Sequence, residues 1–209
     1  MSSAAANTTS ELEPGPAWEI ARLFPDQGDF TEAQYLRLTD HTNRLAEFID
    51  GKIEVLPMPT IEHQRILAFL FEVIRAYVLR HKLGEALFAG VRVRMVDRHY
   101  REPDIVFLRH DRVAKQGNRY WELADLVMEV VSEDDPDRDL ITKRHEYAAA
   151  GIPEYWIVDP RNKSILVLTL DGKEYVAHCE VRGAGQVRSK LLDGFTLDAA
   201  AVFAAGLGA

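Results

Sequence analysis

The sequence predicts a mixed α/β (α+β) fold in which helices pack on a central mixed sheet. Three observations predict it. Apolar side chains recur every three or four positions from Ile66, which is typical of an amphipathic helix, expected over residues 60–83. The aliphatic run at residues 126–132 predicts a buried strand. Two Asp-Gly pairs, at residues 50–51 and 171–172, lie between apolar runs and predict a β-hairpin near each end of the chain.

The N-terminal part begins with a segment of small, polar and proline residues. We expect residues 1–17 to form a disordered leader, and residues 18–209 to form one domain, because no repeat or linker interrupts them. Thr31 is expected to cap a short helix at residues 31–36. Residues 45–49 and 52–56 form the first predicted hairpin, and the long helix is expected to stop at Gly84.

The remaining elements follow in a simple order. Residues 85–89 are a weak strand candidate, whereas residues 91–95 alternate cleanly between apolar and basic side chains and predict a half-buried strand. Another strand at residues 104–108 follows Pro103, which is tolerated at a strand start. After the strand at 126–132 we expect an acidic turn at residues 133–137, a helix at 138–149 and a strand at 154–159. A second hairpin (164–170 and 173–181) and a C-terminal strand fragment with a helix (191–207) complete the chain.

Composition excludes several classes of protein. With 47% hydrophobic and 28% charged residues the chain is an ordinary globular protein. No apolar run approaches the roughly 18 residues of a membrane span, and no secretory signal is recognised, so we expect a cytoplasmic protein without a membrane partner. A single cysteine excludes an intrachain disulfide. The net charge of −8 argues against a non-specific nucleic-acid coat but not against a nuclease, whose metal-binding carboxylates add negative charge.

Glu129 is the residue that most needs an explanation. It stands in the middle of an apolar strand, where an unpaired charge would cost several kcal/mol, so it must be neutralised, hydrogen-bonded or bound to a cation. Asp104 opens a neighbouring strand candidate, and pairing of the two strands would bring the two carboxylates together. Such oxygen ligands suit Mg²⁺, with Mn²⁺ as a substitute. Lys143, on the helix after the acidic turn, could approach the same point and support hydrolysis of a phosphodiester.

Each of these residues also has a structural explanation. Asp104 could cap the start of its strand, and Lys143 could be a solvated surface charge. Glu129 could pair with Arg92 or Arg94 in the core. The order acid, acid, lysine along a strand–strand–helix succession favours the functional interpretation.

Three segments carry a family resemblance. Residues 101–106 (REPDIV), 126–132 (LVMEVVS) and 143–160, which end in GIPEYWIVDP, closely resemble the Uma2 family of restriction-endonuclease-like proteins in the PD-(D/E)XK nuclease superfamily. With residues 47–51 and 57–63, the resemblance covers most of residues 45–170. It implies an α-β-β-β-α-β core, the order already expected from the strands near residues 91, 104 and 126. It also implies that Asp104 and Glu129 are the metal ligands.

The sequence departs from the superfamily motif at one position. The motif lysine lies two residues after the second acid on the same strand, where this chain has Val131. The resemblance suggests that Lys143 takes its place from the helix. His63 and Glu47 are secondary candidates: His63 begins the long helix, where related nucleases often use a polar or acidic residue near the metal, and Glu47 could be an outer acid. Local hydrogen bonding and a place in the hairpin are their structural alternatives.

The sequence therefore predicts a Mg²⁺-dependent DNA endonuclease. Two alternatives remain open: a nuclease-fold binding or scaffold module with weak or absent catalysis, and a phosphohydrolase that acts on nucleotides or RNA. A homodimer is expected, because cleavage of a duplex requires two cuts. A stripe of basic residues could face phosphates or be ordinary surface charge; it comprises Arg92, Arg94, Arg98 and Arg101.

Overall fold

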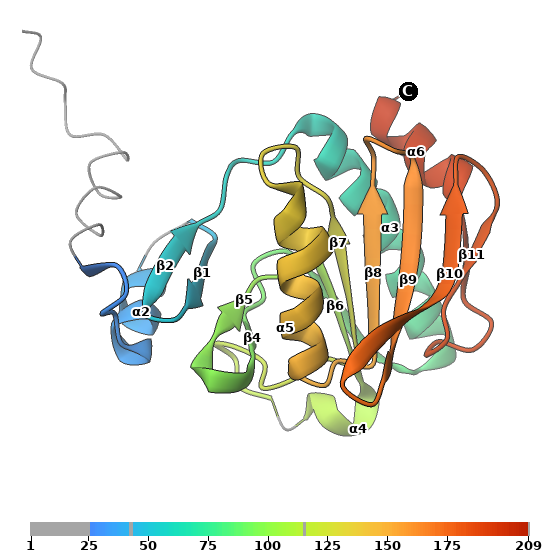
Figure 1. Ribbon diagram of the computed structural model, residues 1–209. Helices are drawn as coiled ribbons and strands as arrows, with labels where there is room; N and C mark the ends of the chain where they lie inside the picture. The colour runs from blue at the N-terminus through green and yellow to red at the C-terminus, as the bar shows by residue number, and fades with distance from the viewer. Residues whose placement is uncertain (1–25, 42–43, 115, 209) are drawn as a thin grey trace, which may run out of the picture.

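A six-stranded mixed sheet forms the centre of the computed structural model, which describes residues 26–41, 44–114 and 116–208 (Figure 1). The strand order is β10-β9-β8-β7-β6-β3. The strands are β3 (Gly84–Phe88), β6 (Ile105–Arg109), β7 (Leu126–Val130), β8 (Glu154–Asp159), β9 (Ser164–Asp171) and β10 (Glu174–Arg182). This sheet confirms the predicted fold class. The predicted leader at residues 1–17 lies outside the described residues.

Strands β7 and β8 are parallel, whereas the other neighbours in the sheet are antiparallel. A parallel pair needs a crossover connection. Here the crossover is a π-helical turn, η3 (Arg138–Thr142), followed by helix α5 (Lys143–Ala149). The predicted helix at 138–149 is therefore present, with a wider first turn than expected. Helix α5 covers one face of the sheet, and Tyr147 is buried in the apolar cluster of that face (Figure 1).

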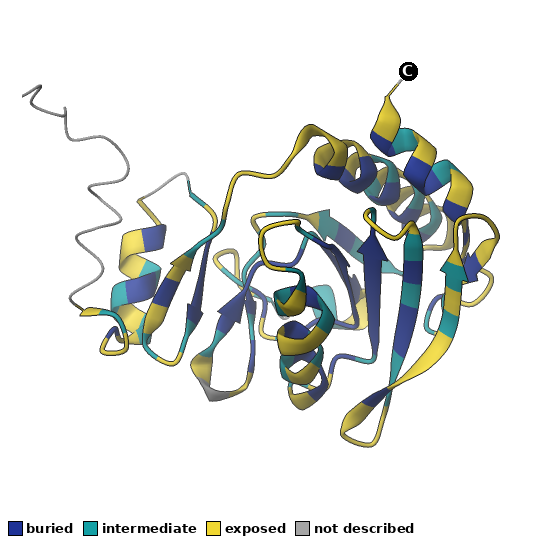
Figure 2. Cartoon of the chain, turned by 45° about the horizontal axis from the view of Figure 1, so that its top comes forward, coloured by how far each residue is buried: buried dark blue, intermediate teal, exposed yellow. Residues whose placement is uncertain are grey.

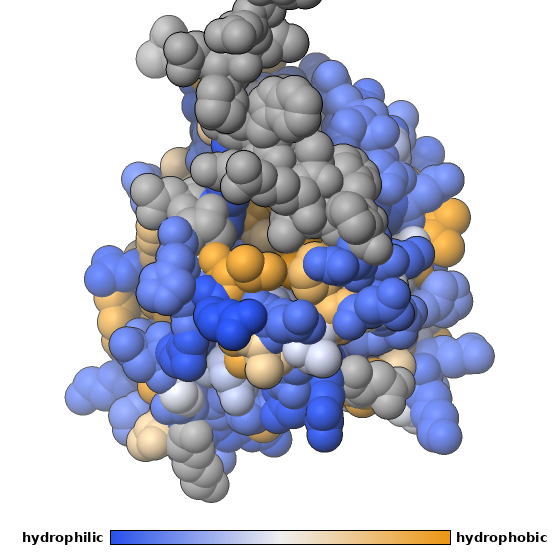
Figure 3. All heavy atoms as spheres, turned by 90° about the vertical axis from the view of Figure 1, so that its left-hand side faces the viewer, coloured by the Kyte–Doolittle hydropathy of each residue, from blue (hydrophilic) through white to orange (hydrophobic). Residues whose placement is uncertain are grey.

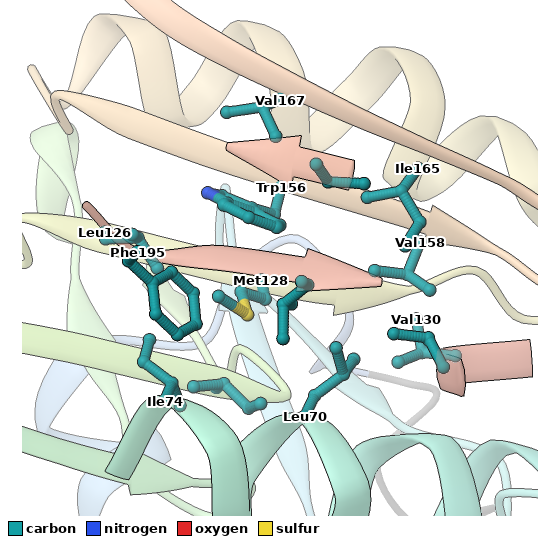
Figure 4. Packing of buried hydrophobic residues seen from close by; sticks show 14 of the residues in the cluster. Leu70, Ile74, Leu126, Met128, Val130, Trp156, Val158, Ile165, Val167 and Phe195 are labelled. Carbon is teal, nitrogen blue, oxygen red and sulfur yellow. The ribbon is translucent and has the colours of Figure 1, made fainter. Parts of the chain in front are cut away.

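Helices α3 (Ile61–His81) and α6 (Ala199–Leu207) cover the opposite face. Thr60 caps α3 by accepting a hydrogen bond from the backbone N–H of His63, and Lys82 ends the helix in a left-handed conformation. Leu70 and Ile74 point from α3 toward the sheet, as the close view of the core shows (Figure 4). The helices turn their buried sides to the sheet and their exposed sides outward (Figure 2).

A smaller sheet with strand order β2-β1-β5-β4 lies beside the central one. Its strands are β1 (Ala46–Ile49), β2 (Lys52–Val55), β4 (Val93–Arg94) and β5 (Tyr100–Arg101), and helix α2 (Glu32–Thr39) precedes them. Thr31 caps α2 as predicted, and Tyr35 of α2 stacks on Phe48 of β1. The face of the molecule on this side is mostly hydrophilic, with smaller hydrophobic areas (Figure 3).

The predicted strand at residues 91–95 is wrong in extent and in place. Only Val93–Arg94 are in a strand, and this strand belongs to the smaller sheet. The first strand of the core is β3, whose sequence pattern is weak because β3 is an edge strand and only Ala86 in it is buried. Counted from β3, the core has the expected order: α3, β3, β6, β7, α5, β8.

Both predicted hairpins are confirmed, as β1–β2 and β9–β10. The remaining elements are short: η2 (Val96–Arg98), α4 (His110–Val113), β11 (Gln186–Arg188) and β12 (Thr196–Asp198). No helix in the described part of the chain combines the length and the apolar character needed to cross a membrane.

Candidate active site

The register of β6 and β7 brings Asp104 and Glu129 together. Ile105 pairs with Met128 in an antiparallel ladder, so the next positions outward, Asp104 and Glu129, lie opposite each other. Asp104 Oδ2 also accepts a hydrogen bond of 2.8 Å from the backbone N–H of Val130. The first predicted acid is thus tied to the strand that carries the second.

Lys143 reaches the same place from helix α5. Its Nζ lies 3.0 Å from Glu129 Oε1 and 2.9 Å from Asp139 Oδ1, and Glu47 Oε1 is 3.9 Å away. The lysine side chain is only 5% exposed. Lys143 is therefore a buried cation among carboxylates, and the structural alternative of a solvated surface charge is wrong.

Asp139 is a further residue of the site, and the sequence marks it only weakly. Its side chain is 3% exposed and meets Lys143 one helical turn later in the chain. The spacing of four residues between an acid and a lysine on a helix was the available signal. This signal is weak, because Asp139 follows an acidic segment that is typical of a solvated turn.

Glu47 comes from the smaller sheet and is fully buried. It accepts hydrogen bonds from the backbone N–H of Glu102 (3.0 Å) and from the guanidinium of Arg101. Burial alone would raise the pKa of Glu47, but the charges of Lys143 and Arg101 outweigh it, and the pKa lies below its ordinary value. Glu47 is thus an ionised acid beside Lys143, in addition to its place in the β1–β2 hairpin.

Arg101 connects the smaller sheet to helix α5. Besides Glu47, it binds Glu146 with two hydrogen bonds of 2.6 and 2.8 Å, and it is 2% exposed. It therefore cannot belong to a phosphate-facing stripe. Arg92 and Arg94 do not pair with Glu129, because they form ion pairs with other acids, namely Asp40, Glu102, Glu32 and Glu122.

His63 stands on the other side of Asp104. Its Nε2 lies 3.2 Å from Asp104 Oδ2, and its backbone N–H is used by the Thr60 cap. Burial would lower the pKa of His63, but the hydrogen bond and charge of Asp104 raise it above the ordinary value. Both explanations considered for His63, a contact near the site and a local hydrogen bond, are present in the structure.

The cluster contains four acids and fewer basic side chains. Its acids are Glu47, Asp104, Glu129 and Asp139. Its lysine is Lys143, and Arg101 is shared with an acid outside the cluster. Burial raises the pKa of Glu129 to about 8; the ammonium of Lys143 opposes this rise, and the charges of Asp139 and Asp104 add to it. Burial would lower the pKa of Lys143, but Glu129, Glu47 and Asp139 raise it above the ordinary value, so the lysine stays charged.

A cavity of about 490 Å³ is lined by Asp104, Glu129, Asp139, Lys143 and His63. The cavity lies at the carboxyl ends of the parallel strands β7 and β8, the edge at which open α/β sheets bind ligands. Residues 57–60, which connect β2 to α3, form another part of its wall. The acids are therefore buried in the protein yet open to a cavity large enough for a ligand.

The donor set fits a magnesium ion. Asp104 Oδ1 and Glu129 Oε2 make no hydrogen bond with the described residues and are available as ligands. Within residues 26–41, 44–114 and 116–208, no three His, Cys, Asp or Glu side chains form a metal-binding group by themselves. This set does not suit zinc, which needs three or four protein ligands. It does suit Mg²⁺, which takes one or two carboxylates and completes its shell with water and phosphate oxygens.

Comparison with known proteins identifies the family of the chain. The model of the Uma2 family, described as "Putative restriction endonuclease", matches residues 32–200. The chain belongs to the Uma2 family. The match includes the central sheet and the smaller sheet of this Uma2 protein, and it runs from α2 to the start of α6.

A solved structure has the same fold as this Uma2 chain. It is titled a "putative nuclease belonging to DUF820" from Anabaena variabilis, and the two structures have a TM-score of 0.71 at 21% sequence identity. The similarity covers 85% of this chain and 99% of the other. No protein in the curated set matches the chain.

Proposed function

We propose that this Uma2 protein is a Mg²⁺-dependent endonuclease that hydrolyses phosphodiester bonds of DNA. The observation that carries the proposal is the pairing of Asp104 with Glu129 across two strands, with Lys143 Nζ 3.0 Å from the glutamate. The three groups line one cavity, and their types are those that phosphodiester hydrolysis requires. Membership of a family described as a restriction endonuclease supports the same reaction class.

The carboxylates of Asp104 and Glu129 would hold the ion through their free oxygens. When bound, Mg²⁺ lowers the pKa of water and screens the charge of the phosphate. Lys143 has a raised pKa and remains protonated, so it acts as a hydrogen-bond donor rather than as a general base. Its ammonium would orient the attacking water and stabilise the negative charge that develops on the phosphate oxygens. Glu47 would position this ammonium as one of the acids that surround it.

Isosteric substitutions of the two acids test the proposal. Asp104→Asn and Glu129→Gln should each abolish metal-dependent cleavage of a DNA duplex, because each removes an anionic ligand at little cost in volume. Glu174→Gln, in an exposed position of β10, is the matched control and should cleave like the wild type. Wild-type rates in either site variant would reject the assignment.

One observation favours a second candidate, a nuclease-fold binding module without catalysis. Lys143 already contacts Glu129 and Asp139, and this ion pairing partly neutralises the acids without a metal. Calorimetric titration with Mg²⁺ or Mn²⁺ separates the two candidates. Metal binding that Glu129→Gln removes is expected for the nuclease, and an absence of binding would favour the module.

We also propose that the protein is a homodimer, because one site makes one cut and a duplex requires two. Light scattering should then give twice the chain mass of 23.6 kDa. A dominant monomer would contradict this assembly. Parallel assays with duplex DNA, RNA and nucleotides test the preference for DNA, and faster hydrolysis of RNA or nucleotides would make the protein a phosphohydrolase of that other class.

A further inference from the structure

One arginine of the acidic cavity has no strong partner. Arg138, the first residue of η3, lines the cavity that contains Asp104 and Glu129, and its side chain is 16% exposed. Its Nε is buried and has no hydrogen-bond partner among the described residues. Its Nη2 lies 3.5 Å from Asp134 Oδ2, on a side chain that is 49% exposed. This distance is longer than a charge-assisted hydrogen bond, and an ion pair so exposed contributes little.

The other basic side chains at the cavity are held by acids. Arg161 donates two hydrogen bonds to Asp159, at 2.9 and 2.7 Å. Lys143 is enclosed by carboxylates. Of the lysine and arginine side chains that line this cavity, Arg138 is therefore the one without a close acidic partner among the described residues.

The chemistry of Arg138 fits a phosphate group. A guanidinium offers a planar fork of N–H donors that matches two oxygens of a phosphate, and it keeps its charge at all physiological pH values. A nucleic acid that enters the cavity must approach the acids of this cluster, and a cation at that cavity reduces the repulsion. Arg138 also directly precedes Asp139, which contacts Lys143, so the backbone holds the guanidinium close to the site.

We propose that Arg138 binds a phosphate of the nucleic-acid substrate in this cavity. The inference rests on the proposed function, since it takes the ligand to be a nucleic acid. It extends that function by assigning to Arg138 a substrate contact that is separate from the metal ligands and from Lys143.

Salt dependence of DNA binding tests the role of Arg138. The affinity for a fluorescein-labelled DNA duplex is measured by anisotropy over a range of NaCl concentrations, in Ca²⁺, which also prefers oxygen ligands. Gel analysis of the same samples checks that the duplex stays intact. Arg138→Gln should weaken binding about tenfold, because it removes a charged hydrogen bond. It should also reduce the slope of log K against log[NaCl] by about 0.9, the value for one phosphate contact.

Arg161→Gln is the matched control, because its guanidinium lines the same cavity but is held by Asp159. It should keep the wild-type slope. A purely structural role of Arg138 would lower the unfolding temperature without changing the slope. If Arg138→Gln does not fold, Asp134→Asn tests the same idea by releasing the arginine. It should tighten binding more than Glu133→Gln, which removes a neighbouring exposed acid, and equal effects of the two would contradict the inference.

The outcomes separate the inference from the proposed function. If the wild type binds DNA and Arg138→Gln keeps the wild-type slope, the inference is overturned and the nuclease proposal stands. If the slope depends on Arg138 but no cleavage occurs in Mg²⁺ or Mn²⁺, the phosphate contact stands and the hydrolysis fails. If the wild type does not bind DNA, both are overturned.

Discussion

Replacing Lys143 by methionine removes the ammonium from the acidic cluster and leaves a side chain of similar length. Nζ lies 3.0 Å from Glu129 and 2.9 Å from Asp139, and none of the three side chains is more than 5% exposed. Removal of one partner from a buried ion pair costs about 3–5 kcal/mol, because the remaining charge has no compensation. We therefore expect Lys143→Met to lower the free energy of unfolding by about that amount at pH 8.5.

The loss should depend on pH in a defined direction. Burial raises the pKa of Glu129 to about 8 even though Lys143 opposes the rise, so the variant should have a still higher pKa at this carboxyl. The folded variant then binds a proton that the unfolded chain loses near its ordinary pKa of 4.5, and stability falls as the pH rises above that value. The wild type binds the same proton up to about pH 8, so the penalty of the variant should be smaller at pH 4.5 and should grow above pH 8, where only the variant keeps the carboxyl protonated. Mg²⁺ should restore part of the stability, because the ion replaces the missing positive charge beside the acids.

Urea unfolding followed by tryptophan fluorescence, at pH 4.5 and 8.5 and with and without Mg²⁺, measures these effects. Lys173→Met, in the exposed turn of the β9–β10 hairpin, is the matched control and should change the free energy of unfolding by no more than about 0.5 kcal/mol. A loss below about 1 kcal/mol for Lys143→Met, or an equal loss at both pH values, would refute the description of Lys143 as the charge partner of buried acids.

Two further predictions concern the scaffold. Glu154 is fully buried and accepts four hydrogen bonds, from the Trp156 indole and from donors in residues 189–191. Glu154→Gln should therefore lower the free energy of unfolding by about 1.5–3 kcal/mol in urea titrations. An unchanged unfolding midpoint would show that these hydrogen bonds are replaceable. Ile74 is fully buried between α3 and the sheet (Figure 4), and Ile74→Ala should lower the free energy of unfolding by about 2–5 kcal/mol. Leu79→Ala on the same helix, 55% exposed, should cost about 0.5 kcal/mol or less, and equal losses in thermal unfolding would contradict the packing described.

Periodicity in the sequence predicts those elements whose burial is regular. Helix α3 and strand β7 show a clear apolar pattern because each packs on the core along its whole length. Strand β3 does not, because it lies at the sheet edge and buries only Ala86. The alternation at residues 91–95 reflects the burial of Val93 and Met95 in the cluster on the α5 side, which does not require a core strand.

The residue pattern alone marks a site residue only where that residue violates its local pattern, whereas Asp104 and Lys143 are predicted from the order of the elements and the family resemblance. Glu129 is recognisable because a carboxylate interrupts an apolar strand. Asp139, Arg101 and Arg138 lie in charged surroundings in the sequence, where a buried charge looks like a solvated one. Asp139 and Arg101 are buried, and Arg138 is partly buried, through tertiary packing that the sequence pattern does not contain.

The wide turn η3 has a consequence for the spacing of the chain. The N–H of Lys143 bonds to the carbonyl of Arg138, five residues earlier, whereas an α-helix would use the fourth. Across this turn Asp139 Oδ1 lies 2.9 Å from Lys143 Nζ, so the turn places the aspartate against the lysine. Tyr147 of α5 is buried against the sheet and fixes the position of this helix. Deletion of one residue from 138–142 would therefore leave α5 in place and move Asp139 away from Lys143. The number of residues in this turn therefore sets the position of Asp139 relative to Lys143. An engineered one-residue deletion in the turn should damage the site more than many substitutions would.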